Sequence, residues 1–360
     1  MKIIAIFLLS LLTSPLCAEI VRLGAGGEEF CYISPDAEYS IAEDSILPGQ
    51  GLFSYFSGSD KPLYPEITYP GVVERGNILS GLIFLAAAVD RTAAKLWDAE
   101  GNILVEAGAF RIARRRDFNV WSLLLGIPSV LKGGRYTLAV EGREKERHFF
   151  HLGAVEVVEK KFGFEQIALN LQLSDLLSKP HIQKEHDFKK LREILQSFNP
   201  GSVYHTGSFI TPVDSSRITS NFADRRKYQP THGSGYLSVH NGIDLAAPEG
   251  APVWACGSGR VVMSVYRIMS GNTVVVEHLP GVFSLYYHLS DLWVKAGDMV
   301  KQGQILGSVG MTGLATGPHL HWELRVSGVA VDPQVPVRAP LLDKSYIFSI
   351  LKTIEMHERR

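Results

Sequence analysis

The sequence predicts a mostly β protein with an N-terminal β-sandwich-like domain, a helical connector and a C-terminal antiparallel β domain. Three observations favour this fold class. Short β-prone runs separated by turn residues fill positions 19–159, apolar residues recur at helical spacing between 185 and 198, and strand-like runs with regularly placed glycines return from 207. The length of 360 residues is typical of about two domains.

The first 18 residues have the layout of a secretory signal peptide. Lys2 precedes an apolar run at 3–12, and Leu16-Cys17-Ala18 offers a small-residue cleavage site. The apolar run is too short to span a bilayer comfortably. We therefore expect a protein that is exported by its signal peptide and cleaved after Ala18. The mature chain is then expected in the periplasm or cell envelope, or secreted, without a transmembrane segment.

Residues 19–159 are expected to form a β-rich accessory domain. The segments 95–97 and 103–106 flank an acidic, glycine-containing turn at 98–102, and such a turn between β-prone runs predicts a hairpin. Strands at this spacing are typical of a β-sandwich such as the immunoglobulin-like fold. The sequence of this region contains no catalytic constellation, so we expect a positioning or regulatory module.

Residues 160–206 are expected to form a helical connector. Apolar side chains recur at helical spacing between 185 and 198, and Asn199-Pro200-Gly201 ends the helix. Two interpretations remain open for this segment: a packed linker, or a lid over the cleft of the following domain.

Residues 207–336 are expected to fold as an antiparallel β domain. The β-branched and aromatic runs 273–278 and 282–288 bracket Leu279-Pro280-Gly281, and this arrangement predicts a hairpin. The remaining residues, 337–360, form a C-terminal tail, in which 345–360 have the character of a short amphipathic helix with a charged end.

Charge and cysteine content argue against two classes of function. Lys plus Arg total 36 and Asp plus Glu total 37, so the chain lacks the overall basic field of a dedicated nucleic-acid binder. Signal cleavage would leave Cys31 and Cys256, which lie in different halves of the chain. We expect two buried thiols rather than a disulfide, and neither a cysteine zinc site nor a catalytic thiol.

Histidines cluster in the C-terminal domain, in three motifs. His240 and Asp244 are four residues apart, and the glycine between them argues against a helix. On a strand or its exit loop these two side chains share a face. His319 and His321 likewise share one face of a strand, and His288 ends the second strand of the predicted hairpin.

This pattern is typical of a catalytic zinc site. Hydrolysis of an amide at neutral pH needs a strong nucleophile and a stabilised oxyanion, and zinc provides both by acidifying a bound water and polarising the carbonyl. Such a site takes three protein ligands and leaves one position open. His240 and Asp244 would supply two ligands, and either His319 or His321 the third. The two remaining histidines, His288 among them, are then left as general base or oxyanion donor.

Three longer stretches around these residues share the pattern of one enzyme family. They are 240–253, 286–289 and 310–323, and they are flanked by 218–222 and 331–333. With them, the segment 207–336 resembles the lysostaphin/LytM-type zinc metallopeptidases, which are peptidoglycan endopeptidases of the murein-hydrolase class.

The resemblance implies roles for five residues. The family's zinc ligands fall on His240, Asp244 and His321. Its two non-ligand active-site histidines fall on His288 and His319, and either of them is left as the general base. The resemblance further implies Zn2+ as the cofactor, and a zinc-bound water that attacks a peptide carbonyl of peptidoglycan.

The resemblance also implies a compact antiparallel β fold with a substrate groove walled by the loops 225–239 and 265–271. Within the first loop, the basic run 225–227 either meets an acidic stem peptide or forms a solvated turn. Ala223 stands where the family has the glycine of Gly-x-Arg, a departure that affects the edge of the groove and leaves the ligands untouched.

We therefore expect a zinc-dependent endopeptidase that hydrolyses peptide bonds in peptidoglycan cross-links or stem peptides by metal-activated water. The alternative is a catalytically inactive LytM-like module that binds and activates another cell-wall hydrolase, but such modules have lost ligands and none is lost here. A lipoyl-type carrier module needs a lysine at a hairpin tip, and residues 279–281 contain none. A regulatory protein partner is left unidentified.

Overall fold

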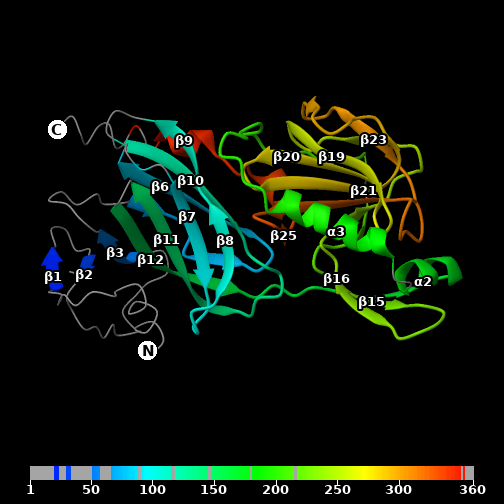
Figure 1. Cartoon of the computed structure of the whole chain (residues 1–360), viewed down its shortest axis with the longest axis horizontal. Helices are drawn as coiled ribbons and strands as arrows, with labels where there is room; N and C mark the ends of the chain where they lie inside the picture. Colours follow the sequence, from blue (N-terminus) through cyan, green and yellow to red (C-terminus); the bar gives the residue numbers. More distant parts are fainter. Residues whose placement is uncertain are drawn as a thin grey trace. The chain divides into compact units, whose positions relative to one another are not determined.

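A computed structural model of the chain (Figure 1) describes residues 20–23, 30–33, 51–56, 66–86, 89, 91–114, 118–144, 147–178, 181–214, 217–349 and 352. The chain divides into two compact units, 1–160 and 161–360. The prediction of a mostly β protein is confirmed. The predicted signal peptide at 1–18 lies outside the described residues.

The first unit is built from sheets that are antiparallel except at one strand. A four-stranded sheet has the order β4-β6-β10-β9, and a six-stranded sheet follows β3-β12-β11-β7-β8, with β5 parallel to β12. A separate pair joins β1 to β2. The strands are β1 (Ile20–Leu23), β2 (Phe30–Ile33), β3 (Gly51–Phe56), β4 (Glu66–Thr68), β5 (Val72–Glu74), β6 (Ile78–Ala86), β7 (Arg91–Trp97), β8 (Ile103–Gly108), β9 (Phe110–Arg114), β10 (Phe118–Gly126), β11 (Gly134–Glu144) and β12 (Arg147–Val158).

The two larger sheets of this unit share a core. Strand β10 of the first sheet contacts β7 and β8 of the second. Leu79, Ile83 and Leu123 from the four-stranded sheet are fully buried, and so are Leu96 and Leu138 from the six-stranded sheet. Sheets that bury apolar faces against each other form a β-sandwich, as predicted. The immunoglobulin-like character of this domain stays a prediction.

The hairpin expected around 98–102 is confirmed by the antiparallel pairing of β7 and β8. Asp98 Oδ1 accepts hydrogen bonds from the backbone N–H groups of Glu100 (3.1 Å) and Asn102 (2.7 Å). Gly101 has φ 84°, a left-handed conformation that glycine adopts at little steric cost. Local turn chemistry therefore sets this hairpin.

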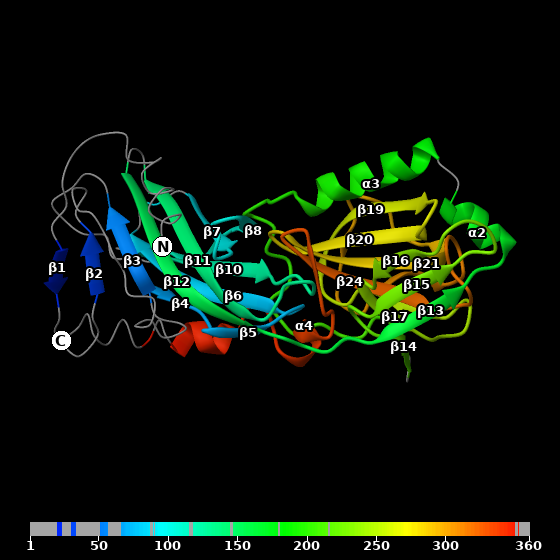
Figure 2. The same cartoon turned by 90° about the horizontal axis from the view of Figure 1, so that it is seen from below.

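The second unit contains a ten-stranded antiparallel sheet and a three-stranded sheet (Figure 2). The large sheet follows β14-β17-β24-β21-β20-β19-β22, with β18, β23 and β25 paired alongside, and the small sheet has the order β13-β15-β16. The strands are β13 (Phe164–Ala168), β14 (Ile218–Ser220), β15 (Arg225–Gln229), β16 (Tyr236–Val239), β17 (Gly242–Leu245), β18 (Pro252–Trp254), β19 (Gly259–Arg267), β20 (Gly271–Leu279), β21 (Val282–Leu292), β22 (Met299–Val300), β23 (Ile305–Val309), β24 (Leu320–Val326) and β25 (Val329–Val331).

The predicted hairpin at 273–288 is confirmed by β20 and β21, which pair antiparallel. Gly281 at its tip has φ 74°, again the left-handed region. The expected buried state of Cys256 is also confirmed: its thiol is free and fully buried, and burial raises its pKa to about 12. The side chain of Cys31 lies outside the described residues.

The connector differs from its prediction at its start. Helices α2 (Leu171–Ser178) and α3 (Ile182–Leu195) are present, but 164–168 form the strand β13, which pairs in parallel with β15. Exposed and half-buried residues alternate along β13, a period of two that is typical of a strand. The prediction of a purely helical connector was therefore wrong for this segment, and 161–206 belong to the second unit.

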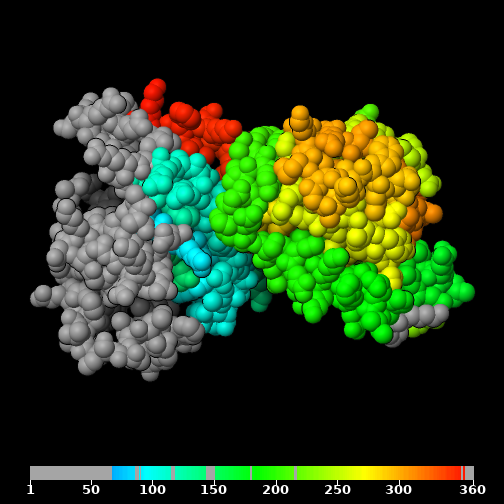
Figure 3. All heavy atoms as spheres, turned by 45° about the horizontal axis from the view of Figure 1, so that its top comes forward, coloured from blue at the N-terminus to red at the C-terminus, as the bar shows by residue number. Residues whose placement is uncertain are grey.

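Helix α3 packs on the large sheet. Leu191 and Leu195 are buried in one apolar cluster with side chains of β19, β20 and β21. Asp187 Oδ2 accepts a hydrogen bond from the backbone N–H of Ile268 (3.0 Å), beyond the end of β19. Figure 2 shows α3 lying along β19 and β20, and green atoms border yellow atoms in the space-filling view (Figure 3).

Among the residues that the structure describes, no helix is long and apolar enough to cross a membrane. Helix α4 (Val335–Arg338) spans the boundary between the predicted domain and the tail, and 344–349 in the tail are helical. Most of the remaining tail lies outside the described residues.

Candidate metal site

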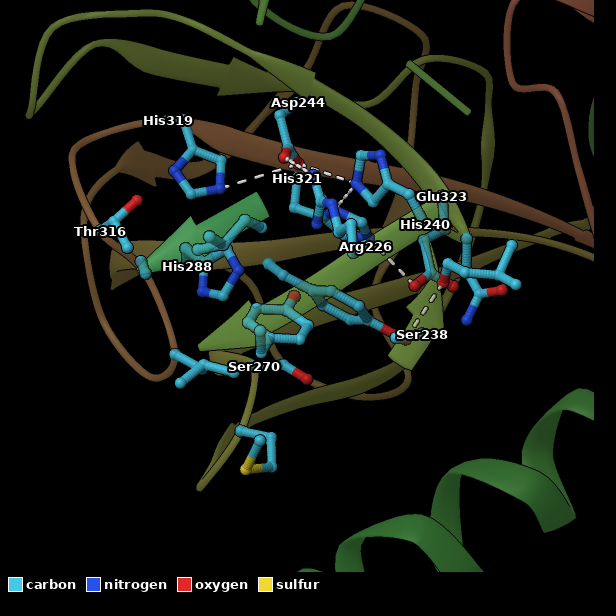
Figure 4. A pocket seen from close by; sticks show the side chains of 18 of the residues that line it. Arg226, Ser238, His240, Asp244, Ser270, His288, Thr316, His319, His321 and Glu323 are labelled. Carbon is cyan, nitrogen blue, oxygen red and sulfur yellow. Dashed lines mark hydrogen bonds and ion pairs between the residues drawn. The ribbon is translucent and has the colours of Figure 1, made fainter. Parts of the chain in front are cut away.

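Three side chains expected to bind metal converge at the β17–β24 pair (Figure 4). Asp244 in β17 lies opposite His321 in β24, and His240 comes two residues before β17. All three residues are buried. One ligand atom from each lies within 4.8 Å of the others. The strand register therefore brings together residues that are about 80 positions apart in the sequence.

The hydrogen bonds behind the site determine which nitrogen of each imidazole faces it. His240 Nδ1 lies 2.8 Å from the carbonyl oxygen of Asn221, so Nδ1–H donates and Nε2 keeps its lone pair. His321 Nε2 lies 3.0 Å from Glu323 Oε1, so Nε2–H donates and Nδ1 keeps its lone pair. Such outer partners orient the ligating imidazoles of metal sites.

The inward-facing atoms are all electron-pair donors. His240 Nε2 is 2.9 Å from His321 Nδ1, and Asp244 Oδ1 is 3.1 Å and 2.8 Å from these two nitrogens. With the imidazoles neutral, no proton lies between these atoms, so a cation is needed to hold them together. Two imidazole nitrogens and one carboxylate oxygen suit a transition metal with one open coordination position.

Without metal, the same site binds a proton. Burial lowers the pKa of His321, but its hydrogen bonds with Asp244 and Glu323 raise it to about 9. Burial raises the pKa of Asp244, yet hydrogen bonds with both histidines hold it well below its ordinary value. The pKa of His240 is lowered, chiefly by burial. The site thus attracts one positive charge.

The two histidines expected to act without binding metal lie beside this cluster. His288 Nδ1 donates to the carbonyl oxygen of Thr312 (2.7 Å), and His319 Nδ1 donates to that of Gly317 (2.8 Å). In each ring the other nitrogen, Nε2, is left with its lone pair. His319 Nε2 is 3.7 Å from Asp244 Oδ1. The ring centroids of His288 and His319 lie 4.9 Å apart. Burial lowers the pKa of His288 to about 3.

His288 has a strained backbone. Its φ is 62°, in the left-handed region that non-glycine residues seldom adopt. The pairing of β20 with β21 shifts register between Asn272 and Val274, opposite this point, and the backbone N–H of His288 donates to Ser270 O (2.8 Å). Such irregularities re-aim side chains next to active sites, where strain of about 1–3 kcal/mol is tolerated.

The five residues line one pocket, whose walls come from four segments. Two were expected: 225–239 contributes Tyr228 and Ser238, and 265–271 contributes Ser270. The sequence analysis did not name the loop 314–316. The strand β13 and the residue after it belong to the connector, for which a lid over the cleft was one of the two open interpretations. From the connector, Ile167 and Leu169 line the pocket, and their alternation with polar neighbours was a usable signal of a strand.

Two charged pairs behind the site were also missed. Glu323 Oε2 accepts hydrogen bonds from Arg325 Nε (2.8 Å) and Nη2 (2.6 Å). Burial raises the pKa of Glu323, but Arg325 lowers it to about 2, so the carboxylate stays charged. Arg226 donates to Asp244 Oδ2 (2.5 Å) and is only 11% exposed. The alternative of a solvated turn is therefore wrong for Arg226, whose side chain is largely shielded from solvent and pairs with two carboxylates.

At Ala223, the position that departs from the family pattern, the backbone adopts the conformation of a glycine. Its φ is 65°, so it adopts the left-handed conformation for which glycine is best suited. Its backbone N–H donates to the carbonyl oxygen of His240 (2.7 Å). The turn at Ala223 therefore forms with alanine in place of glycine, and its hydrogen bond to the carbonyl of His240 is retained.

Comparison with known proteins finds a family match over this part of the chain. Residues 238–333 match the model of peptidase family M23. The peptidoglycan DD-endopeptidases ShyC and ShyA of Vibrio cholerae serotype O1 are 43% and 40% identical to this chain over 124 and 151 residues, which are 34% and 41% of this chain. The alignments cover only 28% and 34% of those relatives, so the chain matches about a third of their length.

A solved structure is also similar. The catalytic domain of the antimicrobial peptidase lysostaphin from Staphylococcus simulans is 27% identical, with a TM-score of 0.27, and the match covers 41% of this chain and 97% of that domain. The resemblance predicted from the motifs is confirmed. The second unit of this chain therefore carries a domain of peptidase family M23.

Proposed function

We propose that this chain is a zinc-dependent endopeptidase that hydrolyses peptide bonds of peptidoglycan. The observation that carries the proposal is the convergence of three lone-pair atoms, His240 Nε2, Asp244 Oδ1 and His321 Nδ1, in one buried cluster. Members of the matched family are metallopeptidases, and two imidazoles with one carboxylate are a common catalytic zinc set.

In this proposal the three residues hold the metal, and bound zinc supplies an acidified water and polarises the scissile carbonyl. His288 and His319 handle the protons. Because the Nδ1–H of each donates to a backbone carbonyl, each Nε2 can accept a proton and then donate it to the developing oxyanion or the leaving amine. The backbone bonds hold both rings in place during this exchange.

The substrate class is supported by the relatives. ShyC and ShyA are named peptidoglycan DD-endopeptidases, which favours cross-link peptides as the substrate of this chain. The predicted signal peptide at 1–18 supports export to the periplasm or cell envelope. We propose that the N-terminal β domain positions or regulates the peptidase, since the group of residues that could hold a metal ion among the described residues lies in the second unit.

The test is digestion of purified sacculi by the mature chain, with and without a chelator, followed by mass analysis of the released muropeptides. We expect loss of cross-linked dimers that chelator abolishes and Zn2+ restores, and the masses name the bond. The Asp244→Ala chain is the matched control. If the metal-loaded chain cleaves nothing but accelerates another wall hydrolase, the activator alternative replaces the peptidase.

A further inference from the structure

A partly buried hydrogen-bond network links the metal site to β13, outside the segment that matches the family. Arg226 Nη2 donates to Asp244 Oδ2 (2.5 Å), the carboxylate oxygen that does not face the two histidines. Arg226 Nε donates to Glu165 Oε2 (3.0 Å). Asp244 is thus held by an arginine that is itself held by a glutamate from β13.

A second branch runs from Glu165 to the other side of the site. Ser220 Oγ–H donates to Glu165 Oε1 (2.6 Å), and Ser220 Oγ accepts from Arg226 Nη2 (2.6 Å). Ser220 Oγ also lies 3.3 Å from His240 Nδ1, beside the stronger bond of that nitrogen to Asn221. Glu165 therefore anchors groups behind two of the three expected ligands.

Glu165 also contributes a negative charge that balances the positive charge of Arg226. Arg226 places a positive charge against a carboxylate that is expected to bind a cation, and the Arg226 and Asp244 side chains are only 11% and 10% exposed. At this burial the arginine would oppose cation binding unless a second negative charge balances it. Glu165, 26% exposed and in an ion pair with Arg226, supplies that charge.

We propose that Glu165 is a positioning residue of the metal site, acting through Arg226 on Asp244 and through Ser220 on His240. The proposal rests on the proposed function in one respect, that the site binds a metal. It assigns a functional role to the connector, because β13 places Glu165 by pairing with β15, with Glu165 opposite Arg226 in the register.

The test measures metal binding by the metal-free full chain, so it does not need hydrolysis. Zn2+ affinity is taken from competition with a chromophoric chelator, and Co2+ is added to read the geometry of the site from its visible absorption. Glu165→Gln keeps the shape and removes the charge. We expect Zn2+ affinity to fall about 10- to 100-fold, the range for loss of an outer-shell partner, with an altered Co2+ spectrum.

The matched control is Gln166→Ala, the next residue of the same strand. Gln166 is exposed and bonds Gln229 at the edge of the small sheet, so its loss should leave affinity and spectrum unchanged. Ser220→Ala, which removes one of the two anchors, should lower affinity by a smaller factor. If Glu165→Gln does not fold, the Zn2+ affinity of the Ser220→Ala chain tests the proposed network instead.

Two results would overturn the proposal. One is a folded Glu165→Gln chain whose Zn2+ affinity stays within twofold of the parent with an unchanged Co2+ spectrum. The other is an equal loss of affinity in Gln166→Ala, because that would mean a general effect of disturbing β13. Failure of the chain to cleave sacculi while these shifts persist would count against the proposed reaction and leave the role of Glu165 standing.

Discussion

Asp244 and His321 lie opposite each other on neighbouring antiparallel strands, with Asp244 Oδ1 2.8 Å from His321 Nδ1. This cross-strand pair is the centre of the candidate site. The remaining groups either join it, as His240 does, or hold it from behind, as Glu323 and Arg226 do. The predictions below separate these roles.

Removal of a proposed ligand should abolish both metal binding and activity. For His240→Ala or Asp244→Ala we expect a loss of Zn2+ affinity greater than the roughly 10- to 100-fold cost of losing an outer-shell partner. Metal content after dialysis and sacculus cleavage measure the two effects. His232→Ala, a change at a half-exposed histidine outside the site, is the control. A zinc-loaded, fully active Asp244→Ala chain would refute the ligand assignment.

Replacement of His288 should separate metal binding from turnover. His288→Ala is expected to keep the metal and lower kcat about 10²- to 10⁴-fold, the usual contribution of a general acid or base. His288→Asn is the sharper variant, since asparagine tolerates the left-handed backbone found at this position. Equal loss in both variants points to the imidazole. Recovered activity in His288→Asn would instead show that the backbone shape matters most.

Loss of the charge behind His321 should weaken metal binding. Glu323→Gln removes the carboxylate that accepts from His321 Nε2, so we expect Zn2+ affinity to fall about 10- to 100-fold. Glu277→Gln is the matched control, because Glu277 is equally buried in the same sheet and pairs with Arg260. Similar losses in both variants would contradict a specific role for Glu323.

The second unit should lose stability as the pH falls. His278 is fully buried, and burial lowers its pKa to about 3, whereas an unfolded histidine titrates near 6.5. Between these values the unfolded chain binds the extra proton, so the free energy of unfolding falls with decreasing pH by up to about 1.4 kcal/mol per unit. Urea unfolding of His278→Gln between pH 4 and 6.5 should show a shallower dependence. The control is His186→Gln, a change at an exposed histidine. If His278→Gln leaves the pH dependence of the unfolding free energy unchanged from the parent chain, this role of His278 is contradicted.

Helix α3 should stabilise the fold without acting on the metal. Leu191→Ala removes a side chain from the buried cluster on the large sheet, and we expect a loss of about 2–5 kcal/mol in unfolding free energy. Phe188→Ala, at a 58% exposed position of the same helix, should cost little. Metal affinity should not change in either variant. Faster cleavage by a Leu191→Ala chain would favour the lid interpretation, which otherwise stays a prediction.

The parts of the fold that the sequence predicted are those with local causes. The hairpins at 98–102 and 279–281 follow from turn residues beside β-prone runs, and the expected ligands followed from their spacing and a family resemblance. Strand β13 was missed because its partner β15 lies about 60 residues further along the chain, and a parallel pair leaves no turn signal between its strands. The prediction of a solvated turn failed at Arg226 because its ion-pair partners come from β13 and β17, which are distant from it in the sequence.

Exchange of this family M23 domain between proteins, by recombination or by engineering, has to keep the pairing of β13 with β15. A segment cut at 238–333 would lose β14, the strand paired with β17. It would also lose β13 and β15 of the small sheet and cut through β16. It would also leave the apolar cluster on β19, β20 and β21 bare, where α3 now lies. A domain cut in this way would expose unpaired strand edges and an apolar surface patch, and both promote aggregation. The portable module begins near residue 161, well upstream of the segment 238–333 that matches the family.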